Sequence, residues 1–307
     1  MDFFLDIPMC AYNHEKYIAQ AIEGVIKQKT NFKYRLFIGE DASTDQTKKI
    51  ILEYSLKYPE IVFPIFQDSN IGASENTRIL FSKCTSKYIA LCDGDDYWDD
   101  ETKLQKQVDF LESNANFSMC FHNVLIKREY SSSNDNKVDK FNGLMPKDEF
   151  VFEDVLDNWI AHTSSLVFKR TALLPLPDWF FNCFTGDLVI IILLASKGKL
   201  KYLDFVGSVY RLNDRGISVN YKEKYLMEGK IQLYKLLNQH FNFSYKKTLN
   251  KFQSKYYLKL SIVNFRNFEV GNFLYNSTKS LVLSPYVFVK QFIIEFKYYV
   301  NLAKAKV

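Results

Sequence analysis

Three carboxylates gather around one glycine in the segment Asp93-Gly94-Asp95-Asp96, which directly follows the apolar run at residues 87–92. A buried strand that ends in this segment delivers the carboxylates to the carboxyl edge of a sheet, where open α/β sheets bind ligands. Adjacent carboxylates repel one another, and oxygen ligands suit a hard cation such as Mg²⁺ or Mn²⁺ that is shared with substrate phosphates. The segment therefore predicts a site for a metal-bound phosphate ester. The alternative is a solvated acidic turn that caps the next helix.

Polar residues also follow each of the three earlier strand candidates. Tyr12 and Asn13 follow the first, Asp41 the second, and Asn70 and Gly72 the third. Taken alone, each of these segments has a local explanation as a helix cap, a turn or a half-buried aromatic. Because the carboxyl ends of parallel strands meet at one edge of a sheet, we expect the four segments together to form one site.

The elements that must position these residues alternate along the first third of the chain. The apolar patterns predict strands over residues 3–10, 35–39, 61–67 and 88–92, and helices over residues 15–28, 45–56, 73–83 and 101–112. This βαβα order predicts a parallel sheet flanked by helices. Further strands are expected at 117–128, 164–169 and 200–210, with a mobile polar loop at 131–142 and a buried helix at 188–196.

Composition places the chain among ordinary soluble proteins, with 47% hydrophobic and 24% charged residues. The sequence contains neither an apolar run of the roughly 18 residues that a membrane span needs nor a secretory signal. Its five cysteines form no C-x-x-C pair, which argues against a disulfide framework and a zinc site. We expect a cytoplasmic protein.

The charge is unevenly distributed along the chain. Residues 221–307 hold 15 Lys and Arg against 4 Asp and Glu, whereas residues 1–220 hold 25 against 31. Lysines interleaved with Tyr and Phe in this basic tail fit an interfacial helix on an anionic membrane, peripheral to the inner face of the plasma membrane. They fit equally a helical cap that packs its aromatics on the catalytic domain. No nucleic-acid module is evident, so we expect no nucleic-acid partner.

The chain resembles the inverting family 2 glycosyltransferases of the GT-A fold, of the bacterial surface-polysaccharide type. The matching segments are IPMCAYNHEKYI, IGEDASTDQT, DSNIG, KYIALCDGDDYWDDETKLQKQVDFL, FTGDLVIIILLASKG and VYRLNDRGIS. The resemblance implies a Rossmann-like, mostly parallel α/β domain over residues 1–220. Residues 1–112 would bind the nucleotide sugar, residues 113–220 the acceptor, and residues 221–307 would form a basic helical extension.

The resemblance also implies roles for individual residues. Asp41 would bind the nucleotide base, Asp93 and Asp95 would hold Mn²⁺ or Mg²⁺ on the diphosphate, and Asp187 would be the general base. Asp187 has a local explanation as a helix N-cap, and capping is compatible with catalysis. The remaining donor-binding positions are Pro8, Tyr12, Asn13, Asn70, Gly72, Arg78, Gly94, Trp98 and Arg211, with Trp98 expected to stack on a sugar ring. Asn213 stands where a metal-binding histidine is common.

These features predict a metal-dependent hexosyl- or N-acetylhexosaminyl-transferase. It would move a sugar from a nucleotide sugar, with UDP preferred, to a polyprenyl-diphosphate-linked or growing surface glycan. One alternative is a degenerate member of the family that binds glycan or scaffolds a membrane assembly. Two departures from the family pattern would support it: Asn213 in place of a histidine, and Gly186 in place of a Glu. Another is a sugar nucleotidyltransferase, although the segment after the first strand is neither glycine-rich nor basic.

Overall fold

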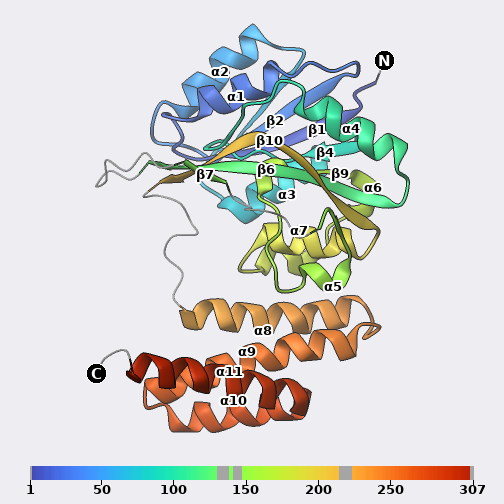
Figure 1. Cartoon of the computed structure of the whole chain (residues 1–307). Coiled ribbons are helices and arrows are strands. Elements are labelled where there is room, and N and C mark those ends of the chain that lie inside the picture. Colours follow the sequence, from blue (N-terminus) through green and yellow to red (C-terminus); the bar gives the residue numbers. More distant parts are fainter. Residues whose placement is uncertain (1, 130–137, 141–146, 214–222, 305–307) are drawn as a thin grey trace. The chain divides into compact units, whose positions relative to one another are not determined.

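The computed structural model describes residues 2–129, 138–140, 147–213 and 223–304 of the 307-residue chain. The chain divides into two compact units, Met1–Gly216 and Ile217–Val307. The first unit is built on a large mixed sheet, and the second is helical (Figure 1). The predicted fold class, an α/β domain with a mostly parallel sheet and C-terminal helices, is confirmed.

The sheet places its four N-terminal strands side by side in parallel. In spatial order the main path is β3 (Val62–Phe66), β2 (Tyr34–Glu40), β1 (Leu5–Ala11), β4 (Tyr88–Ala90), β9 (Val167–Lys169), β6 (Phe117–Glu129), β10 (Lys199–Asn213) and β5 (Tyr97–Trp98). Two short strands, β7 (Val138–Lys140) and β8 (Glu149–Phe150), pair with β6 and β10. Strand β9 is antiparallel to both of its neighbours. The carboxyl ends of β1 to β4 therefore share one edge.

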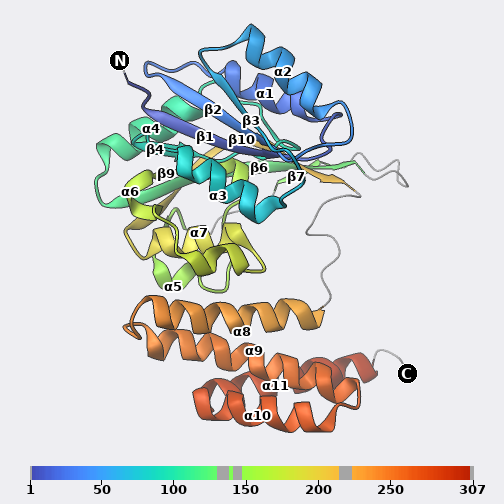
Figure 2. The same ribbon diagram turned by 180° about the vertical axis from the view of Figure 1, so that it is seen from behind.

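Helices cover both faces of this sheet. Helices α1 (Ile18–Ile26), α2 (Thr47–Lys57) and α4 (Lys103–Ser113) lie on one face, and α3 (Ala73–Lys83), α6 (Arg170–Leu173) and α7 (Gly186–Ala195) lie on the other (Figures 1 and 2). Helix α5 (Phe152–Val155) and two 3₁₀ turns, Thr163–Ser165 and Asp178–Asn182, complete the described helical segments of this unit. Each strand of the parallel part buries apolar side chains against these helices, as the apolar runs predict.

Most sequence-based boundaries agree with the observed elements within three residues, and α3 has the predicted bounds. Two expectations need correction. Residues 164–169 were expected to form one strand, but only Val167–Lys169 is extended and Thr163–Ser165 is a 3₁₀ turn. Within the predicted loop at 131–142, Val138–Lys140 forms strand β7, and the rest of that segment lies outside the described residues.

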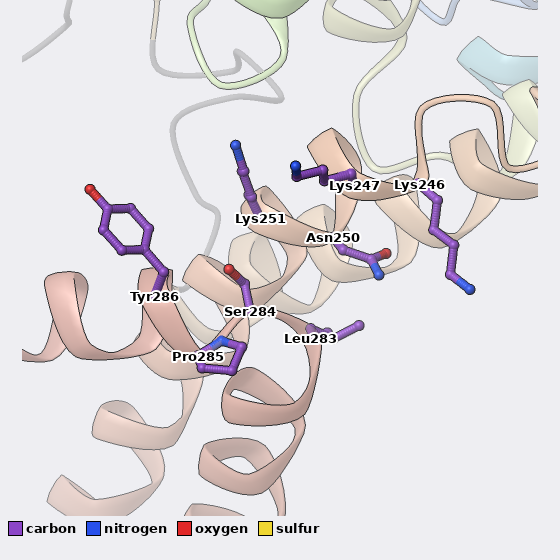
Figure 3. Close-up of a pocket in the computed structure, with 8 residues that line it drawn as sticks. All are labelled: Lys246, Lys247, Asn250, Lys251, Leu283, Ser284, Pro285 and Tyr286. Atoms are coloured by element: carbon purple, nitrogen blue, oxygen red, sulfur yellow. The ribbon is translucent and has the colours of Figure 1, made fainter.

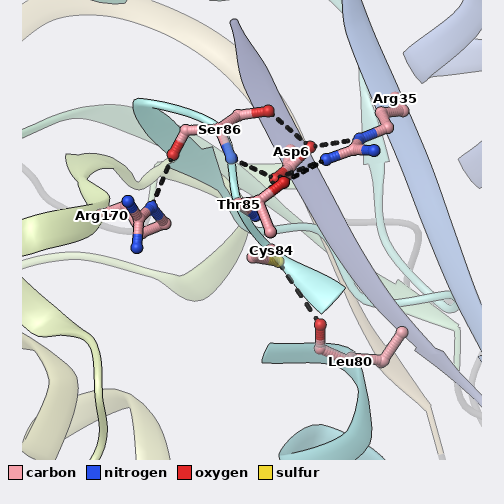
Figure 4. Close-up of polar contacts among 7 residues, drawn as sticks. All are labelled: Asp6, Arg35, Leu80, Cys84, Thr85, Ser86 and Arg170. Atoms are coloured by element: carbon pink, nitrogen blue, oxygen red, sulfur yellow. Dashed lines mark hydrogen bonds and ion pairs between the residues drawn. The ribbon is translucent and has the colours of Figure 1, made fainter. Parts of the chain in front are cut away.

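A buried carboxylate fixes the opposite, amino-terminal edge of the parallel sheet (Figure 4). Asp6 on β1 is fully buried and accepts hydrogen bonds from Arg35 Nε on β2 at 2.8 Å and from the amides of Thr85 and Ser86 at 2.7 and 2.8 Å. Ser86 also receives a bond from Arg170 Nε at its carbonyl oxygen, at 2.9 Å. These contacts tie the start of β4 to β1 and β2, and so set where β4 delivers the acidic segment.

The C-terminal unit consists of four described helices. These are α8 (Glu223–His240), α9 (Lys246–Arg266), α10 (Val270–Leu283) and α11 (Pro285–Lys304). Met227, Ile231, Tyr257 and Leu260 form its apolar centre, and Ser254 Oγ on α9 donates to the Ser280 carbonyl oxygen on α10 at 2.8 Å. None of the helices in the described ranges combines the length and the apolar character needed to cross a membrane.

Candidate active site

The ends of three parallel strands are joined directly by hydrogen bonds. The amide of Asp41, after β2, donates to the Ala11 carbonyl oxygen at the end of β1 at 3.0 Å. The amide of Gly94, after β4, donates to the Cys10 carbonyl oxygen at 3.0 Å, and the amide of Asn13 donates to Ser43 Oγ at 2.9 Å. The structure therefore brings together the polar segments that follow β1, β2 and β4.

Asp41 also connects the segment that follows β3 to the segments that follow β1, β2 and β4. Its carboxylate is 3% exposed and accepts hydrogen bonds from the amides of Ile71 at 2.8 Å and Gly72 at 2.9 Å. Asn70 Nδ2 donates to the Asp41 carbonyl oxygen at 3.3 Å. Gly72 has a φ of +85°, which favours glycine. Asp41 thus orders the loop after β3, and each of its oxygens can accept one further bond.

Asn13 and Tyr12 have different surroundings at the end of β1. Asn13 has a φ of +55°, and its Oδ1 accepts a hydrogen bond from the Thr44 amide at 2.9 Å. Through this bond the Asn13 side chain connects the loop after β1 to the loop after β2. The neighbouring Tyr12 side chain is 42% exposed. Of these two predicted binding residues, Tyr12 therefore presents the more open surface to a ligand.

Electrostatic interactions link the carboxylates of the site. Burial and, to a smaller extent, the charges of Asp95 and Asp187 together raise the pKa of Asp93 to about 7. Burial also raises the pKa of the Cys10 thiol to about 12, with contributions from Asp93, Asp41 and Asp95. Because such interactions require proximity, the predicted base-binding, metal-binding and catalytic acids lie in one neighbourhood.

The position of Gly94 leaves no room for a side chain, because His14 and the main chain of Cys10 approach it closely. A Cβ atom at this position would lie 2.8 Å from His14 Nδ1 and 2.9 Å from the Cys10 carbonyl oxygen. No described residue forms a hydrogen bond with His14 Nδ1, and burial lowers the pKa of this imidazole against the opposing charge of Asp95. Sequence reasoning did not place His14 or Cys10 in the site. The only available signal was their position beside Tyr12 and Asn13.

Asp187 lies in the first turn of α7 with its side chain held in place. Its Oδ1 accepts hydrogen bonds from Thr185 Oγ1 at 2.5 Å and from the Leu188 amide at 3.0 Å. In the described part of the chain, no group forms a hydrogen bond with Oδ2. One carboxylate oxygen thus fixes the rotamer, and the other is free to accept a proton.

Arg211 occupies a buried position beneath the acidic segment. Its side chain is 3% exposed, Nη1 donates to the Asp95 carbonyl oxygen at 2.7 Å, and its amide donates to Asp96 Oδ1 at 3.0 Å. The guanidinium also lies over the rings of Tyr17 and Tyr97, 5.1 and 4.4 Å from their centroids. The predicted role of Arg211 in binding the donor has no support from these contacts, because protein groups already hold the side chain.

Trp98 and Pro8 are likewise part of the core. Trp98 is 3% exposed, its Nε1 donates to the Ser164 carbonyl oxygen at 2.9 Å, and Lys103 Nζ lies 4.1 Å from its ring centroid. This ring is not available to stack on a sugar. Pro8 is buried in the middle of β1, paired in register with Phe37, and so does not line the ligand-binding edge.

Arg78 on α3 is engaged away from the predicted base contact. Its Nε donates to Glu75 Oε2 at 3.0 Å, and its guanidinium lies 3.8 Å from the ring centroid of Phe181. A role in binding the base therefore has no support from these contacts. The side chain of Asn213 lies outside the described residues, as do Gly216 and Ser218 in the family-matching segment VYRLNDRGIS.

The acidic segment fits an open metal site better than a closed one. Among the described residues, no three His, Cys, Asp or Glu side chains are arranged to enclose a metal ion. Asp93 and Asp95 supply two carboxylates whose mutual repulsion a cation would relieve. Mg²⁺ and similar ions commonly take one or two carboxylates and fill the remaining positions with water and substrate phosphates. The residues present fit such an ion.

Comparison with known proteins identifies relatives of this chain. The chain spans about 60% of the length of the first curated relatives that it matches, which include an uncharacterized protein of Mycobacterium tuberculosis that is 33% identical over 213 residues, or 69% of this chain. The dTDP-rhamnosyl transferase RfbG of Shigella flexneri is 27% identical over 240 residues, covering 73% of this chain and 79% of RfbG. The minor teichoic acid biosynthesis protein GgaB of Bacillus subtilis is 26% identical over 203 residues, covering 66% of this chain and 22% of GgaB.

Solved structures share the fold. S. aureus TarS, residues 1–349 in complex with UDP-GlcNAc, superposes with a TM-score of 0.54 at 16% identity, over 92% of this chain and 91% of that one. The family model described as glycosyl transferase family 2 matches residues 6–173, which include β1 to β4 and the acidic segment. The chain belongs to glycosyl transferase family 2.

Proposed function

We propose that this glycosyltransferase is metal-dependent and inverting, and that Asp93, Asp95 and Asp187 form its reaction centre. The observation that carries the proposal is the hydrogen bonding that joins the segments after β1, β2 and β4 and so places the acidic segment at the edge of the sheet. The effect of Asp187 on the pKa of Asp93, across 94 residues of sequence, supports placing Asp187 beside it. Asp93 and Asp95 would hold Mg²⁺ or Mn²⁺. When bound, such an ion stabilises the charge that develops on the departing nucleoside diphosphate.

Asp187 is suited to act as the general base. Its Oδ1 is held by Thr185 and Leu188, and Oδ2 would take the proton from the acceptor hydroxyl. The resulting oxygen attacks the anomeric carbon on the face opposite the nucleotide, and the bond to the diphosphate oxygen breaks. Inversion follows from this single displacement, which gives a β-linkage from an α-linked donor.

The donor would be a nucleotide sugar, with a UDP-sugar preferred. Asp41 and Tyr12 flank the ends of β1 and β2, where the base would bind between a carboxylate acceptor and an exposed aromatic ring. A carboxylate accepts a hydrogen bond from N3–H of uracil or thymine. The names of RfbG and of the TarS complex concern dTDP-rhamnose and UDP-GlcNAc, which both carry such a base. We propose a hexosyl or N-acetylhexosaminyl donor.

The acceptor would be a lipid-linked or growing surface glycan. The relationship to GgaB, named for minor teichoic acid biosynthesis, supports a polymeric surface acceptor. The charge of +11 on residues 221–307 supports peripheral attachment to an anionic membrane, where a polyprenyl-diphosphate-linked acceptor would reside. Binding of the purified chain to anionic but not neutral vesicles at low salt is the expected result for this attachment.

Hydrolysis of candidate donors in the absence of acceptor tests the proposal. The purified chain is incubated with UDP-glucose, UDP-GlcNAc, dTDP-rhamnose or GDP-mannose, with Mn²⁺ or with a chelator, and release of nucleoside diphosphate is followed. We expect slow release from one donor class that stops in the chelator. Equal rates with Mn²⁺ and chelator would refute metal dependence. Release from GDP-mannose alone would refute the assigned base.

A further inference from the structure

A basic pocket lies within the C-terminal helical unit, and its lining includes none of the residues assigned to glycosyl transfer (Figure 3). Its volume is about 640 Å³. Its lining includes Lys246, Lys247 and Lys251 from the start of α9, Ser284 from the turn between α10 and α11, and Tyr286 from the start of α11. We propose that this pocket binds a phosphate-bearing ligand, either a phosphate ester in solution or the phosphate headgroup of an anionic lipid.

The charge of the pocket is not balanced within the described part of the unit. None of the described residues that line it is Asp or Glu. The ion pairs found in the described part of this unit join Lys224 to Glu269 and Arg266 to Glu223, and none includes a lysine of the pocket. The ammonium groups of Lys247 and Lys251 lie near each other, whereas that of Lys246 points away from them (Figure 3). The positive charge along this wall of the pocket favours an anion.

Helix geometry adds to this positive potential. The pocket lies at the N-terminal ends of both α9 and α11, where the helix dipole favours negative charge. At α11, Ser284 Oγ already accepts a hydrogen bond from the Val287 amide at 3.4 Å, so the first turn of α9 is the more open of the two. Neither helix has an acidic residue in its first turn, and the side chain of Tyr245, which precedes α9, forms no capping bond. Lys246 and Lys247 instead occupy the first turn of α9, where a positive charge is unfavourable.

The lysines at the start of α9 lower the stability of this helix by itself. Lys247 and Lys251 are four residues apart on α9, a spacing at which like charges repel. Acidic residues at the start of α9 would stabilise the helix, so its sequence is better explained by a bound anion than by folding alone. Ligation by phosphate would relieve the repulsion between the lysines and satisfy the helix N-termini together.

The side of the pocket formed by Leu283, Pro285 and Tyr286 indicates that the ligand is larger than inorganic phosphate. Leu283 and Pro285 give an apolar surface beside the lysines, and Tyr286, which is 71% exposed, stands on α11 across from Lys251 (Figure 3). A phosphate ester would place its charge among the lysines and its organic part against this wall.

Pyrophosphate binding without divalent metal tests the site directly. A chelator removes any cation at Asp93 and Asp95, which then repel anions, so this measurement is independent of the proposed reaction centre. The test variant is Lys247→Gln with Lys251→Gln. The matched control is Lys235→Gln with Lys279→Gln, which removes the same charge from exposed positions of α8 and α10 outside the pocket.

We expect calorimetry to detect pyrophosphate binding that weakens by about tenfold in the pocket variant and by less than about twofold in the control. Without ligand, the melting temperature of the pocket variant should equal or exceed that of the wild type, because repulsion is removed. No binding, or equal weakening in both variants, would overturn the proposal.

Vesicles identify the source of the phosphate. Phosphatidic acid vesicles, with phosphatidylcholine vesicles for comparison, are tested for co-flotation with each variant in the same chelating buffer. If wild-type co-flotation is lost in the pocket variant alone, the site takes a lipid phosphate. If pyrophosphate binds but phosphatidic acid vesicles do not, the site takes a soluble phosphate ester. Both outcomes support a phosphate site, whereas co-flotation that both variants retain, without pyrophosphate binding, would contradict it.

Discussion

Arg211 Nη1 donates a hydrogen bond of 2.7 Å to the main-chain carbonyl oxygen of Asp95. This contact joins β10 to the acidic segment after β4, across 116 residues of sequence. It fixes the backbone that carries the second proposed metal ligand without using the Asp95 carboxylate. Arg211 therefore positions the site, and its charge lies behind the carboxylates that it supports.

Replacement of Arg211 tests this positioning role. Arg211→Met should lower stability by about 2 kcal/mol, because it leaves buried acceptors without their donor. It should also raise the KM for the donor in Mn²⁺ more than it lowers kcat, since the loop that binds the diphosphate loses its support. Arg128→Met on β6, which removes the 31% exposed partner of Asp139, is the matched control. Unchanged donor affinity in a folded Arg211→Met variant would contradict the assignment.

Asp187→Asn should separate catalysis from binding. The amide oxygen can still accept the bonds from Thr185 and Leu188 that hold the side chain, so the fold and donor affinity should be retained. A neutral amide cannot take the acceptor proton, so kcat should fall by about 10²–10⁴-fold. Steady-state kinetics with a bound-donor control measures both quantities. A kcat within about tenfold of wild type would assign the base to another residue.

Asp41→Asn should loosen the loop after β3. The carboxylate now accepts from the amides of Ile71 and Gly72, and an amide group would turn one acceptor into a donor. We expect affinity for UDP to fall by about tenfold, with a smaller effect on free pyrophosphate, because Asp41 acts at the base end of the site. Titration of both ligands in Mn²⁺ compares them. Equal losses for the two ligands would place Asp41 outside the base pocket.

Lys103 is a buried lysine whose effect on the free energy of unfolding should depend on pH. Its side chain is fully buried, no described residue forms a hydrogen bond with Nζ, and burial lowers its pKa to about 7, opposed by Cys92, Cys120 and Asp100. The unfolded chain keeps the usual value near 10.5. Between these values the unfolded state binds more protons, so this group's contribution to stability rises with pH from about 7 to about 10.5.

Lys103→Met should therefore be more stable than wild type by about 2 kcal/mol near pH 7. The difference between the two proteins should shrink at pH 9.5, where the penalty on wild type is smaller. Urea unfolding at the two pH values gives both differences. A variant that is less stable than wild type, or a difference that does not change with pH, would show that the contact with Trp98 dominates.

The sequence was sufficient for features that depend on local pattern. Apolar periodicity placed α3 at its observed bounds, and the parallel order of β1 to β4 placed Asp41, Asp93 and Asp95 at one edge. Asp187 could be connected to Asp93 only through the family resemblance, because no local pattern links α7 to β4. The electrostatic interaction between them in the structure supports that connection.

Features that depend on tertiary contacts could not be read from the sequence. The partner of Arg211 is a main-chain carbonyl group, which leaves no trace in the residue types. Trp98 was misassigned because a two-residue strand pairs it with β10 and buries its ring. The lysine pocket depends on the approach of the turn after α10 to the start of α9, so the basic composition of the tail alone did not reveal it.

The central claim is that Asp93 and Asp95 bind a nucleoside diphosphate through a divalent cation. Thermal unfolding with UDP, dTDP or GDP, each with Mn²⁺ or chelator, tests it most directly in wild type, Asp95→Asn and the exposed control Asp99→Asn. At about a hundred times its Kd, a ligand adds about 2.7 kcal/mol of stability. We predict this gain for UDP with Mn²⁺ in wild type and Asp99→Asn, and its loss in Asp95→Asn. Equal stabilisation of Asp95→Asn, or none by any nucleotide in wild type, would contradict the account.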